Sequence, residues 1–514
     1  MSARTDIPGT TGRKTAFVLS AVFVVSVFLP LVDSWLGIAP VLPNFEKREF
    51  AKKPTLLPQD LSDYPADRSR SAVLESLDRF PRDYEAWYDD HFGLRSQLIR
   101  WHNIFKARVL RTAPNDEVVI GRGEWLYYGG QLNIEQYRAV TLMPDEILDG
   151  WLLYLSMVRE WVEDHGADYL LVLGPSKHTI QPEYLPERIQ RIGDRTRREQ
   201  FVEALVGEGR QWTLDLTDTL LEENRKMPTY QETDTHWTSW GSLVATRTIV
   251  DELIRSERYS QLQPLSVEDF EQVTREQEGG DIAELMGLTD LYRVEAEFFE
   301  PKGTVPYTWS TDGLPPGVHS YHTPYAATYE ASMLPEGGLP RAVVFHDSFG
   351  EYLAGFLPFA FGRTVLYWQY LPSLEIIAQE QPDLVIQEIG ERVLIRDELK
   401  GGDVPFPIDD RIRADFRRRR MFRAAAETTF RSEGSSDLSG LANTGTEHAL
   451  LRVDVEVDVA GSVRSEEGDR RELVPGRNVV YLEWSGVSAL SFEPASPRRI
   501  RSVEARELSQ GADG

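Results

Sequence analysis

Two short segments of the chain supply the three groups that a serine acyl-transfer site needs. Asp234 and His236 stand two residues apart in one segment, and Ser348 stands in the other. A serine hydroxyl is a poor nucleophile at neutral pH, so an imidazole must accept its proton, and a carboxylate must orient that imidazole. On a loop, Asp234 and His236 can form one hydrogen-bonded pair. The sequence therefore predicts an Asp–His–Ser triad.

The surroundings of Ser348 predict that the nucleophile sits at a strand-to-helix turn. The apolar run 342–345 precedes it and predicts a buried strand, and an apolar stretch with helix-like spacing begins at Phe349. A nucleophile at such a turn projects from the edge of the sheet, and we expect backbone N–H groups at the helix start to hold an oxyanion. His346, two residues before Ser348, is an alternative base.

Four further residues are candidates for contacting the substrate or the oxyanion: Lys177, Trp237, Asp347 and Tyr352. Lys177 could contact an acyl oxyanion or an acidic sugar, with a solvated lysine at a strand end as the alternative. The two aromatic rings could stack on pyranose rings. Asp347 could also order the turn through hydrogen bonds to its backbone. No metal site is predicted.

Apolar strands that alternate with helices must position these residues. We expect strands at 169–173, 342–345, 364–367 and 384–389, and helices at 146–164 and 238–255. Continuous apolar strands separated by helices favour an α/β fold, in which helices flank a parallel sheet on both faces. In such sheets the reactive groups sit at the carboxyl ends of the strands.

The motif formed by Asp234, His236 and Trp237 resembles the Asp-x-His-Trp hallmark of the SGNH-like acetyltransferase family, which includes the alginate O-acetyltransferases. The pair Asp347-Ser348 resembles the nucleophile block of that family. Blocks at 84–95, 120–127, 175–186 and 280–285 agree in the same order, so the resemblance covers roughly residues 80–400. Two departures are that His346 replaces the glycine of ordinary SGNH hydrolases, and that Ser348 follows the Asp/His pair.

The resemblance implies an SGNH-hydrolase-like fold and a serine-dependent O-acetyltransferase. An acetyl group would pass through acetyl-Ser348 onto hydroxyls of an exported polysaccharide, as in alginate biosynthesis. The acetyl donor would be a separate multi-pass membrane acyltransferase, and no soluble cofactor is implied. Two alternatives are a carbohydrate acetyl-esterase with the same triad and a non-catalytic subunit that binds polysaccharide or helps assembly.

The N-terminal apolar run 15–32 predicts a membrane anchor, because about 20 residues of helix span a bilayer. Arg4, Arg13 and Lys14 precede it and predict a single pass of the inner membrane with the N-terminus inside and the rest in the periplasm or outside. A cleaved signal peptide is the alternative. The chain has no cysteine, which excludes disulfides and a thiol nucleophile.

Length and charge bound the remaining possibilities. A chain of 514 residues suffices for two or three domains, and its net charge of −26 excludes nucleic acid as a partner. We predict an anchor at 1–36, a linker at 37–70, a catalytic domain at 71–400 and a β-rich module at 401–514 that could bind carbohydrate. The catalytic domain would start with helices at 71–110 and carry an insertion at 291–335.

Two features of the predicted C-terminal module have functional alternatives. Strict alternation over 450–459 predicts a half-buried antiparallel strand, whose exposed face carries Asp454, Glu456 and Asp458. Calcium binding by these acids is an alternative, although the turn of an EF-hand is missing. The basic run 417–420 predicts a solvated face that could contact an acidic polymer.

Overall fold

Four apolar runs of the sequence become neighbouring strands of one sheet. In the computed structural model these strands are β3 (Asp168–Gly174), β9 (Arg341–His346), β10 (Arg363–Trp368) and β11 (Leu384–Gly390), and each confirms a predicted strand. With β4 (Thr213–Asp215) they run parallel in the order β4-β3-β11-β9-β10. Two antiparallel strands, β8 (Tyr329–Met333) and β7 (Thr308–Ser310), complete this sheet, which has seven strands in the described residues.

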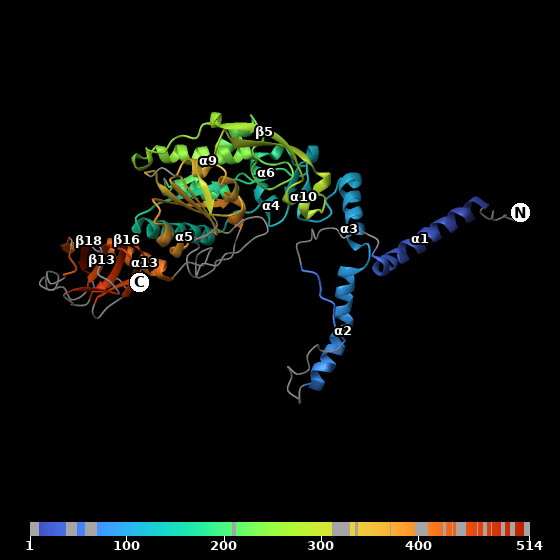
Figure 1. Ribbon diagram of the computed structural model, residues 1–514, viewed down its shortest axis with the longest axis horizontal. Helices are drawn as coiled ribbons and strands as arrows, with labels where there is room; N and C mark the ends of the chain where they lie inside the picture. Colours follow the sequence, from blue (N-terminus) through green and yellow to red (C-terminus); the bar gives the residue numbers. More distant parts are fainter. Residues whose placement is uncertain are drawn as a thin grey trace. The chain divides into compact units, whose positions relative to one another are not determined.

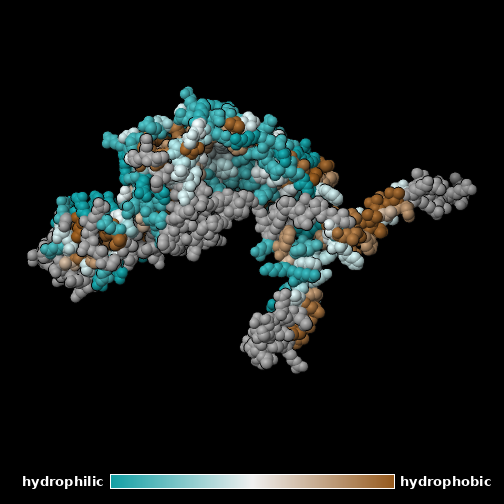
Figure 2. Space-filling view, in the orientation of Figure 1, coloured by the Kyte–Doolittle hydropathy of each residue, from teal (hydrophilic) through white to brown (hydrophobic). Residues whose placement is uncertain are grey.

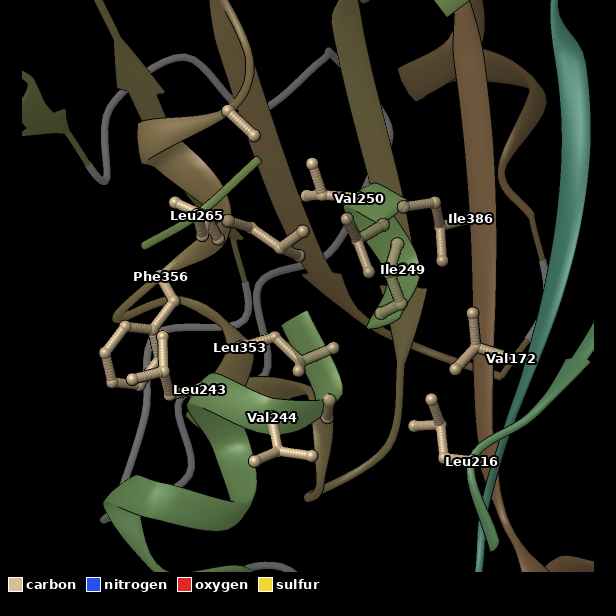
Figure 3. Close-up of a cluster of buried hydrophobic side chains, with 14 of the residues drawn as sticks. Val172, Leu216, Leu243, Val244, Ile249, Val250, Leu265, Leu353, Phe356 and Ile386 are labelled. Carbon is tan, nitrogen blue, oxygen red and sulfur yellow. The ribbon is translucent and has the colours of Figure 1, made fainter. Parts of the chain in front are cut away.

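Helices cover both faces of this sheet, which confirms the prediction of an α/β fold (Figure 1). The predicted helix at 146–164 is α5 (Asp145–Asp164), and its Trp151, Leu155 and Val158 pack against one face. The predicted helix at 238–255 is α9 (Ser239–Ile254). Figure 3 shows its Ile249 and Val250 beside Ile386 of β11, and its Leu243 beside Leu353 and Phe356, in the cluster that covers the other face.

The structure describes residues 10–37, 49–56, 69–207, 212–310, 329–334, 338–370, 372–395, 410–424, 428–433, 435–437, 449–459, 461–465, 470–473, 475–484, 489–493 and 499–507. The chain divides into two compact units, one of residues 1–120 and 278–293 and the other of residues 121–277 and 294–514. Most of the predicted linker at 37–70 and the predicted boundary near residue 400 lie outside the described residues.

The first unit is mainly helical. It contains α1 (Thr10–Leu36), α2 (Ser69–His91), α3 (Arg95–Ile104), the π-helical turn η2 (Phe105–Leu110), β1 (Val118–Ile120), α10 (Asp281–Leu285) and the 3-10 turn η7 (Thr289–Leu291). In the described residues, α1 is the one helix that could cross a membrane by length and composition, over Thr15–Leu36 with a mean hydropathy of 2.5. Its surface is the hydrophobic rod of Figure 2.

The second unit carries further elements around its sheet: β2 (Leu126–Tyr128), α4 (Asn133–Tyr137), α6 (Lys177–Ile180), α7 (Arg197–Gly207), α8 (Thr217–Asn224), α11 (Gly350–Leu353) and α12 (Leu374–Glu380). The predicted insertion at 291–335 includes β6 (Val294–Pro301), which pairs with β5 (Phe270–Gln277) in an antiparallel ribbon. It also supplies β7 and β8 of the main sheet, whereas residues 311–328 lie outside the described part.

The C-terminal residues of the second unit form a helix and two antiparallel sheets. These are α13 (Asp410–Ala424), a sheet of β12 (Thr428–Ser432), β18 (Arg499–Glu507), β13 (Ala449–Val457) and β16 (Gly476–Trp484), and a sheet of β15 (Arg470–Leu473), β14 (Gly461–Ser465) and β17 (Leu490–Glu493). Strand β13 confirms the predicted strand, but the prediction that it is half-buried is wrong. Phe422 of α13 packs with Leu450 and covers its second face.

Several of the charged side chains considered for calcium or polymer binding form ion pairs. Asp454 pairs with Arg477 at 2.8 Å, and Glu456 pairs with Arg501 at 3.3 Å. In the basic run 417–420, Arg419 lies 3.0 Å from Asp164 and also contacts Glu160 of α5. The prediction that this run is solvated is therefore wrong for Arg419, because α13 packs its basic side against α5.

Candidate active site

The carboxyl ends of three adjacent strands bring functional side chains to one edge of the sheet. Ser348 lies between the end of β9 and the start of α11, and Lys177 follows the end of β3. Arg392 follows β11, which lies between those two strands. The strand order, which the sequence does not give, therefore makes the three positions neighbours.

The predicted acid–base pair is formed within one loop. His236 Nδ1 lies 2.6 Å from an oxygen of Asp234, and the backbone N–H of His236 donates to the same oxygen at 2.9 Å. A carboxylate accepts, so this contact puts the proton of a neutral imidazole on Nδ1 and leaves Nε2 as the basic nitrogen. The geometry of the pair is thus the one that a general base requires.

Aromatic contacts join the loop of His236 to the turn of Ser348. The imidazole of His236 stacks on Tyr352, with ring centroids 5.2 Å apart and an interplanar angle of 22°. It also lies 5.2 Å, centroid to centroid, from Phe349, the residue next to Ser348. The structure therefore brings together the two segments, which are more than a hundred residues apart in the sequence.

The hydroxyl of Ser348 has an unexpected partner. In the described part of the chain it accepts a hydrogen bond at 2.6 Å from Nη2 of Arg392, and no hydrogen bond joins it to His236. A guanidinium has donors only and keeps its charge, so Arg392 cannot act as the base. It can instead stabilise negative charge on the hydroxyl oxygen or on an acyl oxygen bound beside it. Sequence reasoning missed Arg392, although its place after a predicted strand was a usable signal.

Two of the backbone N–H groups expected to hold an oxyanion, those of Phe349 and Gly350, already have partners. Asp347 is buried, and its Oδ1 accepts the N–H of Phe349 at 2.9 Å, while its Oδ2 accepts the N–H of Gly390 at 3.0 Å. The N–H of Gly350 donates to the carbonyl of Asp347 at 3.1 Å. Helix α11 has only four residues. The expectation that its first N–H groups bind an oxyanion is therefore wrong for Phe349 and Gly350, and Asp347 orders the turn.

A second buried carboxyl lies beside Asp347. Glu388 of β11 is 0% exposed, and one of its oxygens accepts the backbone N–H of Asp347 at 3.3 Å. Burial, and then the nearby Asp347 carboxylate, raises the pKa of Glu388 well above its ordinary value. Two carboxylates this close do not both ionise readily, so the protonated form of Glu388 is favoured beside the turn that carries Ser348.

Lys177 supports the loop that carries Asp234 and His236 by hydrogen bonds to backbone carbonyls. It is 3% exposed, and its ammonium donates to the carbonyls of Leu126, Glu232 and Asp234 at 2.6, 2.8 and 3.1 Å. An ammonium has three N–H donors, and these contacts account for three. The alternative of a solvated lysine is wrong, because the loop 233–237 closes over the side chain. These contacts make Lys177 a positioning residue for Asp234.

The other candidate residues divide into buried and accessible ones. Trp237 is fully buried and donates its indole N–H to the hydroxyl of Tyr230 at 2.9 Å, so it has no face for a sugar ring. Tyr352 is half-buried and keeps its place beside His236. His346 is buried, donates Nδ1–H to the carbonyl of Asp347 at 2.6 Å, and has a pKa lowered by burial. Its position therefore favours His236 as the base.

Comparison with known families identifies part of the chain. Residues 118–314 match a family model described as SGNH hydrolase-like domain, acetyltransferase AlgX. The resemblance to the SGNH-like acetyltransferases is confirmed. The matched residues include Lys177, Asp234 and His236 and end before Ser348.

Two curated relatives are named probable alginate O-acetylase AlgJ. The protein of Pseudomonas putida is 25% identical over 139 residues, which cover 27% of this chain and 34% of the relative. The protein of Pseudomonas syringae pv. tomato is 26% identical over 213 residues, which cover 41% and 48%. The chain thus matches between about a third and a half of the length of these relatives.

Solved structures of similar proteins superpose on this chain with low TM-scores. The O-acetyltransferase domain of Pseudomonas putida AlgJ has a TM-score of 0.34 at 17% identity and covers 55% of this chain and 93% of that chain. Bacillus cereus PatB1 has a TM-score of 0.39 at 15% identity and covers 55% and 97%. At such TM-scores the overlap by itself supports neither a fold nor a function.

Proposed function

We propose that this chain is an O-acetyltransferase that moves an acetyl group through Ser348 onto hydroxyls of an exported polysaccharide. The observation that carries the proposal is the Asp234–His236 pair, with its 2.6 Å contact, beside the turn of Ser348. Proteins named alginate O-acetylase are among the curated relatives, which supports a polysaccharide as the acceptor.

In the first half-reaction, His236 Nε2 takes the proton of Ser348 as Oγ attacks the carbonyl carbon of an acetyl ester. The tetrahedral oxyanion that forms is stabilised by the guanidinium of Arg392, which already donates to Oγ. His236 then gives the proton to the leaving group. The products are acetyl-Ser348 and the free donor, while Asp234 keeps the imidazole in one tautomer.

In the second half-reaction, a sugar hydroxyl gives its proton to His236 and attacks acetyl-Ser348. The tetrahedral intermediate collapses, the acetyl group leaves with the sugar oxygen, and His236 returns the proton to Ser348 Oγ. Half-buried Tyr352, stacked on the imidazole, offers a hydroxyl and a ring edge for positioning the sugar. Water must be kept out, since hydrolysis of acetyl-Ser348 would make the protein an esterase.

The compartment and the donor complete the proposal. Helix α1 would anchor the chain in the inner membrane by a single pass, with the basic residues before it inside and the catalytic unit in the periplasm or outside. Acetyl groups made in the cytoplasm would reach the site through a multi-pass membrane acyltransferase. The C-terminal sheets are a candidate carbohydrate-binding module.

The test is capture of the acyl-enzyme. The full-length protein in nanodiscs is treated with a chromogenic acetyl ester, and the peptide that contains Ser348 is examined by mass spectrometry for one added acetyl group. We expect the adduct, and we expect a glycan to discharge it faster than water does. Ser348→Ala and His236→Ala should remove it, whereas Ser260→Ala, at an exposed serine, should not. Discharge by water alone would make the protein an esterase.

A second candidate function is a polysaccharide-binding subunit without catalysis. The observation that favours it is that, in the described residues, the hydroxyl of Ser348 is hydrogen-bonded to Arg392 and not to His236. No acetyl adduct, together with glycan binding that Ser348→Ala leaves unchanged, would select this candidate. Catalysis requires the hydroxyl proton of Ser348 to reach Nε2 of His236. The hydrogen bond from Arg392 permits this, because it uses only a lone pair of Oγ, and catalytic hydrogen bonds in free enzymes often tighten only when substrate binds.

A further inference from the structure

Helix α3 and the turn η2 expose one apolar stripe. Leu98, Trp101, Phe105 and Val109 are between 40% and 63% exposed, and their spacing of three, four and four residues puts them on one face. The opposite face is occupied within the same unit. There Asn103 donates to the carbonyl of Met286 at 2.8 Å, and Ala107 is buried. The stripe therefore faces away from the packing within its own unit.

The same segment is basic in an acidic protein. Residues 95–111 contain no Asp or Glu, in a chain whose net charge is −26, and they contain five cationic residues: Arg95, Arg100, Lys106, Arg108 and Arg111. Clusters of Lys and Arg beside an apolar helix face are typical of helices that lie on anionic membrane surfaces. Tryptophan, here Trp101, is enriched at the level of lipid headgroups.

Hydrogen bonds fix the start of α3 to the last turns of α1. Oδ2 of Asp33 accepts the N–H of Leu94 at 2.9 Å, and Oγ of Ser34 accepts the N–H of Gly93 at 2.7 Å. A side chain at Gly93 would meet the carbonyl oxygen of Pro30 at 2.2 Å, so the two segments touch. Because Asp33 and Ser34 lie near the C-terminal end of the apolar span Thr15–Leu36, α3 begins where α1 would leave the hydrocarbon core.

We propose that α3 and η2 lie on the outer surface of the membrane, with the stripe of Leu98, Trp101, Phe105 and Val109 in the boundary between headgroups and acyl chains. The occupant of this face is a lipid surface that contains anionic headgroups. The inference rests on the proposed anchoring by α1. It adds a second membrane contact that would fix the tilt and rotation of the first unit, which one transmembrane helix leaves free.

The absence of cysteine allows a direct test. A single cysteine replaces Phe105 in the full chain, carries a nitroxide, and is reconstituted in vesicles of equal parts phosphatidylcholine and phosphatidylglycerol. Oxygen concentrates in lipid and a charged nickel chelate stays in water, so the ratio of their collision rates reports depth. Phe23→Cys in α1 is the control for lipid, and Val206→Cys, at an exposed apolar residue of α7, is the control for water.

We expect the ratio at Phe105→Cys to lie between the two controls and several-fold above that of Val206→Cys. Labels at Leu98 and Val109 should give high ratios too, and a label at Arg100 a lower one, because it is off the stripe. A ratio equal to that of Val206→Cys would overturn the proposal. A label shielded from both reagents would also overturn it, because protein and not lipid would then cover the stripe.

The two membrane contacts fail in distinguishable ways. If the label at Phe23 is in water, the anchor itself is wrong. If Phe23 is in lipid and Phe105 is in water, the anchor holds and the surface contact is wrong. Capture of acetyl-Ser348 is measured separately, so neither result affects the proposed chemistry.

Discussion

The loop of His236 and the turn of Ser348 are held in place by buried charges of opposite sign. The buried ammonium of Lys177 donates to three backbone carbonyls, one of them that of Asp234. Asp347 lies within the turn and receives the N–H groups of Phe349 and Gly390. Each segment is irregular, and a buried ion satisfies backbone groups that no helix or strand pairs.

A buried charge beside the candidate active site can thus fix the backbone and need not contact substrate. Residue type made Lys177 and Asp347 candidates for contacting the substrate or the oxyanion. Their polar atoms are instead hydrogen-bonded to backbone groups. Ions bound to several peptide groups fix those groups strongly, because the low local dielectric strengthens each bond. Under the proposed function, the side chains that would contact substrate are His236, Ser348, Arg392 and Tyr352.

The largest expected loss of stability follows from removing the buried cation of Lys177 that supports the loop of His236. Lys177→Met keeps the length of the side chain but leaves three buried carbonyls without their donor. We expect the free energy of unfolding to fall by about 3–5 kcal/mol, measured in urea. Lys226→Met is the matched control, because that lysine is exposed and pairs only with Glu223. A loss as small as that of the control would show that the loop does not depend on Lys177.

Periodicity allowed the sequence to predict the sheet and its flanking helices. The strands that became β3, β9, β10 and β11 are continuous apolar runs because helices cover both faces, and that burial is visible in residue types alone. The pair Asp234 and His236 was predictable because its two members are close in the chain. Local patterns of this kind need no knowledge of the tertiary fold.

Contacts that depend on strand order or on packing could not be predicted. Arg392 reaches Ser348 because β11 lies next to β9, and no local pattern gives that adjacency. Lys177 is buried because the loop 233–237 closes over it. Strand β13 alternates like a half-exposed strand, yet α13 covers the polar face and Arg477 neutralises Asp454.

A smaller loss of stability is expected when the buried anion Asp347 in the turn of Ser348 is replaced. Asp347→Asn retains one acceptor but turns an amide N–H₂ towards a backbone N–H, so one of the two bonds is lost. We expect a loss of about 1–3 kcal/mol in the free energy of unfolding, and slower formation of acetyl-Ser348 because the turn is less rigid. Asp218→Asn, at an exposed aspartate of α8, is the control. Unchanged acylation in Asp347→Asn would contradict the positioning role.

A substitution at Arg392 tests whether a side chain proposed to face the substrate affects the acylation rate more than the stability, unlike the buried ions Lys177 and Asp347. Arg392→Lys keeps the charge but loses the planar fork of donors. We expect acylation of Ser348 to slow about tenfold, while the free energy of unfolding changes by less than about 1 kcal/mol. The rate is measured by the release of chromophore in a single turnover. Equal losses of rate and stability would instead assign Arg392 to the structural group with Lys177 and Asp347.

Glu388→Gln should change the free energy of unfolding least at acid pH. The difference from the parent protein should grow as the pH rises. Glu388 has a raised pKa in the fold, so the folded protein keeps a proton that the unfolded chain loses above its ordinary value of 4.5. Stability from this group is therefore full below that value and falls as pH increases through the window above it. Glutamine has no proton to lose and has the same shape.

The stability of Glu388→Gln relative to the parent protein should accordingly rise from pH 5 to pH 8. Urea unfolding at several pH values measures it, with Glu271→Gln, at an exposed residue of β5, as the control for net charge. A difference that stays constant with pH would mean that Glu388 is ionised beside Asp347. The turn of Ser348 would then be held by two buried anions, Asp347 and Glu388. The loop of His236 is held by the single buried cation of Lys177, so the two segments would no longer each depend on one buried charge.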